Sequence, residues 1–249
     1  MAGDKPGSDR ARKISEMRAA QKRKDRKRKS LFGAVVVVVV GGMVAGGVFA
    51  AQNKHNAKTQ ANPTATPSAS IAPAGTGPEG IVLEQGTVLA GLDSAGTGQT
   101  LDGIQCEASE QVAYHVHAHV AIYVDGVLRP VPIGIGIVPP IISQGPGGPF
   151  ASAGKCYYWL HTHTNDGIIH IESPTQTTYT LAQFFAIWGI PLSPTMVGGA
   201  SGPVTAYVNG QQWGADPGSI PLQSRAVIQL NVGSNNPGPQ TVDWSKSQL

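Results

Sequence analysis

Six of the seven histidines in this chain fall into two short clusters that could bind a transition metal. The clusters are His115, His117 and His119, followed by His161, His163 and His170. Alternate side chains of a β-strand project from the same face, so a strand through the first cluster would present its three imidazoles together. Apolar residues occupy the intervening positions and predict that the other face packs on a core. The pattern therefore predicts a metal site on one face of a sheet.

The second cluster gives the sharper prediction. A two-residue hairpin turn at residues 166–167 would set His163 opposite His170 and His161 opposite Glu172. All four side chains would then share one face. We expect His161, His163 and His170 to be the primary ligands, with Glu172 as a fourth ligand or as an acceptor that orients an imidazole.

The first cluster leaves two possibilities open. His115, His117 and His119 either complete the same site across the sheet or form a second site. A different interpretation of all six histidines is a polar seam or a surface that becomes charged near pH 6. Convergent spacing and the scarcity of nearby positive charge favour metal binding over that interpretation.

The residue types favour Zn or Cu over Fe or Mn. Imidazole alone does not select one metal, but Cu(I) sites usually recruit methionine or cysteine thiolate. Here both cysteines are expected to be oxidised and Met196 is the sole methionine after residue 75, so Zn(II) or Cu(II) is preferred. The pair of alternate histidines with a third on a neighbouring strand is similar to the ligand pattern of the α-class carbonic anhydrases. The segment His115-Val116-His117 likewise resembles one in the copper, zinc superoxide dismutases. Each likeness covers these few residues and implies ligand geometry, not an activity.

Two functional classes follow from a site of this kind. One is a metal-binding module for Zn or Cu handling, sensing or storage. The other is a metalloenzyme, of hydratase, hydrolase or oxidoreductase type, in which a three-histidine centre activates water or oxygen. A GxSxG motif and a Walker-type phosphate loop are both missing from the sequence, which argues against a serine hydrolase and against nucleotide use.

The first 51 residues predict a membrane anchor. Residues 1–30 carry twelve Lys and Arg against four acidic residues, and residues 31–51 form an uncharged, largely apolar run of 21. A run of that length can cross roughly 30 Å of hydrocarbon, and the basic tail places the N-terminus in the cytoplasm. A cleaved signal peptide is the alternative. Gly42 and Gly46 form a GxxxG pair that could pack a homodimer, and the tail could contact anionic lipid.

The remaining chain divides into a Pro/Ala/Thr-rich tether at 52–80, a folded extracytoplasmic domain at 81–244 and a short tail at 245–249. From residue 75 onward four basic residues stand against eleven acidic ones, so this part carries about −7 and nucleic acid is excluded as a partner. The only two cysteines, Cys106 and Cys156, lie in this part and predict one disulfide in an oxidising compartment.

The pattern of apolar and turn-forming residues in the domain predicts a β-rich α+β fold, in which antiparallel hairpins form a sheet or sandwich with one short helix. Alternating apolar residues flank Asp125-Gly126, which predicts a type I′ hairpin, and residues 225–232 predict a last strand. Thr180 and Gln183 form a capping box before an apolar stripe that ends at Gly189, which predicts the helix. The Pro- and Gly-rich residues 139–154 predict a long loop that could rim the site.

Overall fold

The computed structural model describes residues 75–247 and residue 249. The predicted basic tail, membrane helix and most of the tether lie outside this range. Within it, none of the helices is both long enough and apolar enough to cross a membrane.

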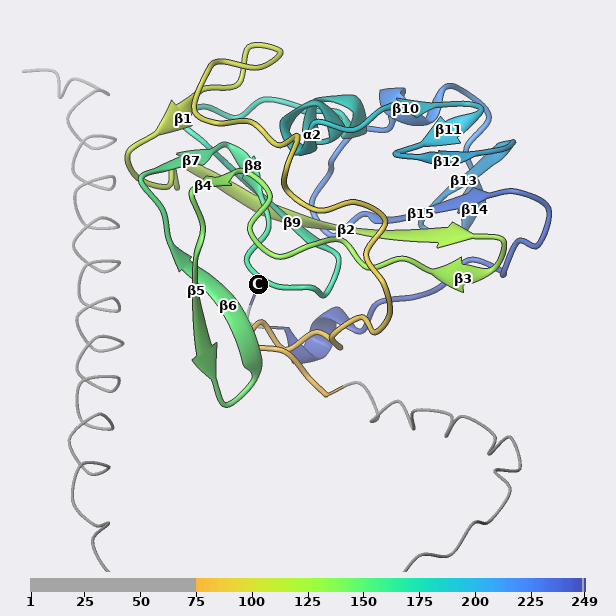
Figure 1. Ribbon diagram of the computed structural model, residues 1–249, viewed down its shortest axis with the longest axis horizontal. Helices are drawn as coiled ribbons and strands as arrows, with labels where there is room; N and C mark the ends of the chain where they lie inside the picture. Colours follow the sequence, from red (N-terminus) through yellow and green to blue (C-terminus); the bar gives the residue numbers. More distant parts are fainter. Residues whose placement is uncertain (1–74, 248) are drawn as a thin grey trace, which may run out of the picture. The chain divides into compact units, whose positions relative to one another are not determined.

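A main sheet of seven strands organises the domain, in the order β14-β13-β15-β2-β9-β8 with β3 beside β2 (Figure 1). Its strands are β2 (Tyr114–Val124), β3 (Val127–Leu128), β8 (Leu160–His161), β9 (Ile168–Ser173), β13 (Val204–Val208), β14 (Gln211–Gln212) and β15 (Val227–Val232). Strands β2 and β15 pair in parallel, and the other pairs are antiparallel. The β-rich fold with antiparallel sheets is confirmed. The parallel pair joins strands far apart in sequence, which local alternation could not reveal.

The predicted hairpin at Asp125-Gly126 is confirmed. Val124 pairs with Val127 across a two-residue turn. Both turn residues have positive φ, 48° at Asp125 and 81° at Gly126, as a type I′ turn requires. This turn ends β2 and so fixes the end of the strand that carries the first histidine cluster.

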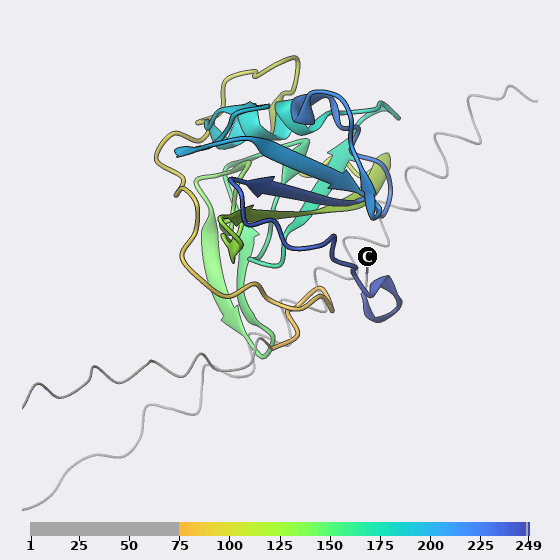
Figure 2. The ribbon, with the colours of Figure 1, turned by 90° about the vertical axis from the view of Figure 1, so that its right-hand side faces the viewer.

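The predicted helix is also confirmed, as α2 (Leu181–Trp188). The backbone N–H of Thr180 donates to the Gln183 side chain at 3.0 Å, and Gly189 ends the helix in the left-handed conformation. Phe184 and Trp188 are fully buried in the core. The helix itself lies over one face of the main sheet (Figure 2). That face is apolar, which leaves the opposite face for the histidines.

Smaller sheets flank the main one. They comprise β1 (Cys106–Glu107), β4 (Ile137–Val138) and β7 (Cys156–Tyr158), then β10 (Leu192–Ser193), β11 (Met196–Val197) and β12 (Ala200–Ser201). Two 3₁₀ helices, η1 (Pro217–Ser219) and η2 (Trp244–Lys246), lie near the C-terminus. The predicted disulfide between Cys106 and Cys156 is present and joins β1 to β7.

Residues 139–154 do not form the expected loop, and that prediction was wrong. They form a hairpin of β5 (Ile141–Gly145) and β6 (Gly148–Ala153). Pro146 and Gly147 form the turn, and Pro149 is tolerated in β6 because a sheet of two strands has only edge strands.

The face of the sheet opposite α2 is covered by the hairpin β5–β6 and by both ends of the described chain (Figure 1). Residues 75–80, which the sequence assigned to the end of the tether, belong to this cover. The N–H of Gly77 donates to the carbonyl of Ile81 at 2.7 Å, and the hairpin turn packs closely against residues 77–78. Glu79 is buried here, at 5 % exposure.

Candidate metal centre

Three adjacent strands place the histidines. Strand β9 lies between β2 and β8, with His117 opposite His170 on one side and His161 opposite His170 on the other. Two residues further along, and so on the same face, His115 lies opposite Glu172. Since cross-strand partners lie roughly 5 Å apart, these side chains converge on one patch of the covered face.

The register of the second hairpin differs from the predicted one. His161 lies opposite His170 and not opposite Glu172, because six residues, 162–167, separate β8 from β9 where a two-residue turn was expected. The hydroxyl of Thr162 donates to the carbonyl of Pro132 at 2.9 Å, which holds the start of this segment away from a tight turn. His163 therefore lies in a loop, yet its ring still reaches the site.

The opposite face of this hairpin is as predicted. Leu160, Ile169 and Ile171 are completely buried in the core. Their burial fixes which face of β8 and β9 the histidines occupy, even though the register was misjudged.

The predicted primary ligands meet in the structure. His161, His163, His170 and Glu172, hereafter the primary site, offer ligand atoms that all lie within 4.8 Å of one another. All four residues are buried. The Nε2 atoms of His161 and His163 are 3.2 Å apart. Three nitrogens and one carboxylate oxygen at this spacing suit a single transition-metal ion.

Backbone carbonyls fix the tautomers of two ligands. The Nδ1 atom of His161 lies 2.9 Å from the carbonyl oxygen of Tyr158, and Nδ1 of His163 lies 2.7 Å from that of Ala151. A carbonyl oxygen can only accept, so Nδ1 carries the proton in both rings. Each Nε2 is left with its lone pair directed into the site, which is how ligating histidines are oriented in metalloproteins.

His170 is held by a carboxylate instead. Its Nε2 donates to Oε1 of Glu79 at 2.8 Å, and its Nδ1 faces the site, 3.4 Å from Oε1 of Glu172. Burial opposes a charge on His170, but Glu79 and Glu172 outweigh it and raise the pKa of the ring to about 10. Burial likewise opposes ionisation of Glu79, yet His170 lowers the pKa of this carboxyl to about 2. The pair makes His170 an electron-rich ligand once Nδ1 is free of its proton.

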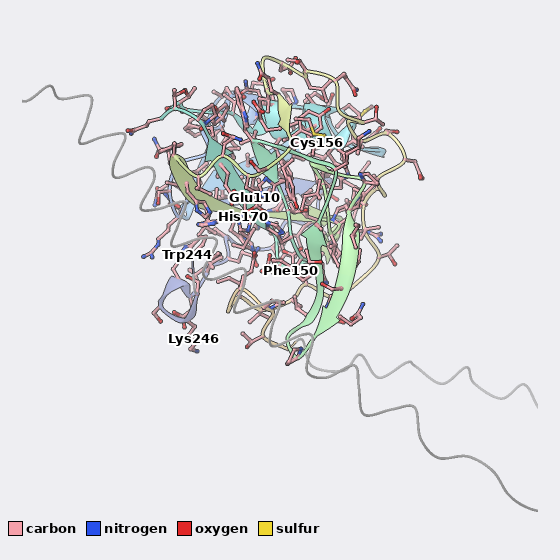
Figure 3. The ribbon with its side chains drawn as sticks, turned by 90° about the vertical axis from the view of Figure 1, so that its left-hand side faces the viewer. Glu110, Phe150, Cys156, His170, Trp244 and Lys246 are labelled. Carbon is pink, nitrogen blue, oxygen red and sulfur yellow. A yellow bond between two sulfur atoms is a disulfide. The ribbon has the colours of Figure 1, made fainter. Side chains whose placement is uncertain are left out.

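Two further side chains border the primary site (Figure 3). Oε1 of Glu110 lies 3.4 Å from Nε2 of His163. Phe150 of β6 stacks on the His163 ring, with 4.6 Å between ring centroids and planes inclined by 4°. Because Ala151 also belongs to β6, the hairpin both positions and shields His163.

Burial keeps other rings neutral. It lowers the pKa of His161 to about 4, although Glu172 favours the charged form. Burial, helped by His170 and His115, lowers the pKa of His117 to about 3. Only a neutral imidazole offers a lone pair to a metal, so these rings are available as ligands at neutral pH without first losing a proton.

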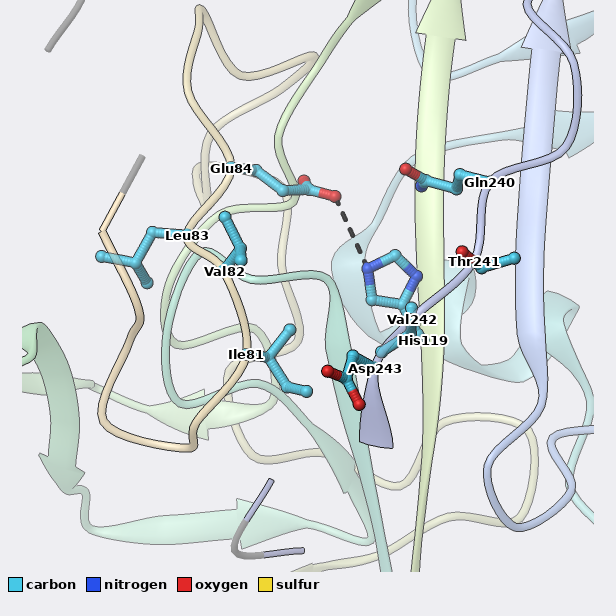
Figure 4. A pocket seen from close by; sticks show the side chains of 9 residues that line it. All are labelled: Ile81, Val82, Leu83, Glu84, His119, Gln240, Thr241, Val242 and Asp243. Atoms are coloured by element: carbon cyan, nitrogen blue, oxygen red, sulfur yellow. Dashed lines mark ion pairs between the residues drawn. The ribbon is translucent and has the colours of Figure 1, made fainter. Parts of the chain in front are cut away.

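The structure divides the first cluster. His115 and His117 adjoin the primary site, and together with His170 they form a second group whose ligand atoms lie within 4.8 Å of one another. His119 is not brought into either group. It lines a pocket of about 200 Å³ bordered by residues 81–84 and 240–243 (Figure 4), where its Nε2 lies 3.8 Å from Oε1 of Glu84.

Sequence reasoning missed Glu79 and Glu110. Glu79 lies in a stretch whose composition is that of a tether, and Glu110 lies in an irregular segment before β2. The sequence offers one hint, which is that acidic residues are few: only eleven follow residue 74. Each of them is therefore a candidate for a special role, but long-range packing decides which of them reach the site.

Glu84→Gln is expected to flatten the dependence of domain stability on pH. Burial raises the pKa of Glu84 from 4.5 to about 8, so the folded state holds this proton more tightly than the unfolded chain. The resulting stabilisation is complete below about pH 4.5 and is lost as pH rises towards 8, at up to about 1.4 kcal/mol per pH unit. Urea unfolding across this range checks the slope.

Two groups face Glu84 and bear on this test. His119 stays neutral because burial lowers its pKa to about 4, and burial also raises the pKa of Asp166 to about 8. Ionisation of Asp166 also lowers the stability of the domain as the pH rises, and Asp166 is still present in the variant. The pH dependence of stability should therefore become weaker but should not disappear. An unchanged slope would show that Glu84 ionises normally in the folded state.

Comparison of the chain with protein-family models, curated proteins and solved structures found no match in any of the three.

Proposed function

We propose that this chain is a membrane-anchored, extracytoplasmic metal-binding protein that holds Zn(II) or Cu(II) for handling, sensing or storage. The observation that carries the proposal is the pair of backbone hydrogen bonds on His161 and His163. They turn two unprotonated Nε2 atoms towards each other in a buried position. This arrangement is energetically costly unless a metal ion lies between the two nitrogens.

The donor set supports Zn(II) or Cu(II). Three imidazole nitrogens and the carboxylate of Glu172 suit either ion, whereas Cu(I) prefers sulfur. Both cysteines are consumed by the disulfide and leave no thiolate.

The number of protein ligands favours a site that stores or retains a metal ion over a catalytic site. Four protein groups complete a tetrahedral shell, which is typical of structural or storage sites, while catalytic zinc keeps one position open. The alternative, a metalloenzyme that activates water or oxygen, would need such a position beside a pocket. The pocket of about 200 Å³ is lined by His119 and not by the four primary ligands.

The proposed location rests on the sequence and the disulfide. The apolar run at 31–51 follows a basic tail, which predicts a single crossing with the C-terminal domain outside the cytoplasm. A disulfide between Cys106 and Cys156 is consistent with that side of the membrane, where oxidised cysteines persist.

Metal analysis of the full-length chain, purified in detergent without a polyhistidine tag, tests the proposal. We expect Zn or Cu to co-purify, or to bind when added, with at least about one ion per folded chain. A folded chain that takes up neither ion would contradict it.

A further inference from the structure

The histidines outnumber the ligands that one ion can use. His115 and His117 on β2 lie across β9 from His161 on β8, with His170 and Glu172 between them. The ligand atoms of His115 and His117 fall in one group and those of His161 and His163 in another, and the atoms of each group lie within 4.8 Å of one another. Two imidazole nitrogens on one zinc ion are at most about 4.2 Å apart, because each binds at about 2.0–2.1 Å. One ion therefore cannot be shared by all of these rings.

His170 cannot serve two ions at its free nitrogen. Both candidate ligand groups include it, but its Nε2 is hydrogen-bonded to Glu79, which leaves Nδ1 for one metal only. A second ion beside His115 and His117 must draw its further ligand from another side chain. The Nε2 atoms of these two histidines are already 3.0 Å apart and point to a common centre.

Glu172 is placed to supply that ligand. Its Oε1 lies 3.0 Å from Nε2 of His115, 3.4 Å from Nδ1 of His170 and 3.9 Å from Nε2 of His161. Its Oε2 is buried and has no hydrogen-bond partner among the described residues. Oε1 therefore lies between the histidines of the two groups, where it could bind an ion on either side, and the buried, unpartnered Oε2 leaves the carboxylate a further oxygen for a metal.

We infer that the centre binds two metal ions bridged by the carboxylate of Glu172. The first ion is the one proposed above, held by His161, His163 and His170, and the inference rests on that proposal. The second ion is held by His115 and His117 and forms the second site.

The charges nearby are suited to two divalent ions. Three carboxylates border the histidines: Glu79 lies beside His170, Glu110 beside His163, and Glu172 beside His115 and His170. Three negative charges offset most of the four positive charges of two ions. No Lys or Arg of the described chain takes part in an ion pair with these carboxylates.

The two sites differ in access to solvent. The side chain of His115 is 37 % exposed, whereas that of His161 is completely buried. With His115, His117 and Glu172 as ligands, the second ion has three protein groups and a fourth position open towards solvent. The second site is thus the exchangeable one, through which an ion or a small anionic ligand reaches the centre, while the first ion is retained.

Titration of the metal-free, full-length chain with Cu(II), followed by electron paramagnetic resonance, tests the inference. Two Cu(II) ions bridged by one carboxylate lie roughly 3.5–4 Å apart and couple magnetically. The first equivalent should give the spectrum of an isolated ion. The second should broaden that spectrum and produce a half-field transition.

Two variants sharpen the test. His115→Ala/His117→Ala should bind one Cu(II) and show no half-field signal, while His119→Gln, changed on the same face of the same strand, should still bind two coupled ions. His115→Ala alone alters an exposed side chain and should weaken the second equivalent even if the double variant folds poorly.

The outcomes separate the two proposals. Binding of a single ion by the wild-type chain, or of two ions without coupling, would overturn the bridged pair and leave the primary site intact. Binding of none would overturn both the pair and the proposed function.

Discussion

Replacing both His161 and His163 with alanine is expected to weaken Zn(II) or Cu(II) binding at the primary site at least about a thousandfold. Structural zinc sites contribute roughly 10–16 kcal/mol over four ligands, or about 2.5–4 kcal/mol per ligand, and each 1.4 kcal/mol is tenfold in affinity. The two rings are buried and oriented by backbone carbonyls, so alanine removes two preoriented donors from the primary site. Competition with a chelator of known affinity measures the loss.

His119→Ala is the matched control for this loss. His119 belongs to the same sequence pattern, but its ring lies beside Glu84 and outside both ligand groups. It should therefore leave the affinity within a few-fold of wild type. Equal losses in the control and in the double variant would mean that binding reflects the general histidine content and not the primary site.

Removal of the disulfide by Cys106→Ser/Cys156→Ser is expected to lower the free energy of unfolding by about 4 kcal/mol. The bridge closes a loop with a sequence separation of 50 residues, and its loss restores that conformational freedom to the unfolded chain. Urea unfolding under non-reducing conditions measures the difference.

The same variant should also weaken metal binding. Cys156 begins β7, and Tyr158 at the end of β7 supplies the carbonyl that fixes the His161 ring. Reversal of the stability loss by saturating metal, with affinity reduced by about tenfold, is the expected pattern. A stability loss well below 1 kcal/mol would show that strand pairing keeps β1 in place against β7 without the disulfide.

Local chemistry explains what the sequence predicted well. The turn at Asp125-Gly126 and the helix that begins after Thr180 are determined by residues within a few positions of one another. The alternation of β2 likewise fixes the face on which His115 and His117 project. These features needed no knowledge of the rest of the fold.

Long-range packing explains what the sequence could not predict. The shift in register at His161 arises because Thr162 hydrogen-bonds to Pro132, thirty residues away, instead of entering a tight turn. Glu79 reaches His170 across 91 positions, and β15 joins β2 in parallel after a separation of about a hundred residues. His119 shares the face of His117, but the covering segment that carries Glu84 encloses it in a different environment.

The most direct test of the central claim is the metal content of the full-length wild-type chain by mass spectrometry, after purification without a polyhistidine tag. A metal-binding function predicts Zn or Cu at about one to two ions per folded chain, and a sharp fall in His161→Ala/His163→Ala. A wild-type chain that remains folded and metal-free after exposure to both Zn(II) and Cu(II) would contradict the claim. The clustered histidines would then have to be explained by proton binding alone.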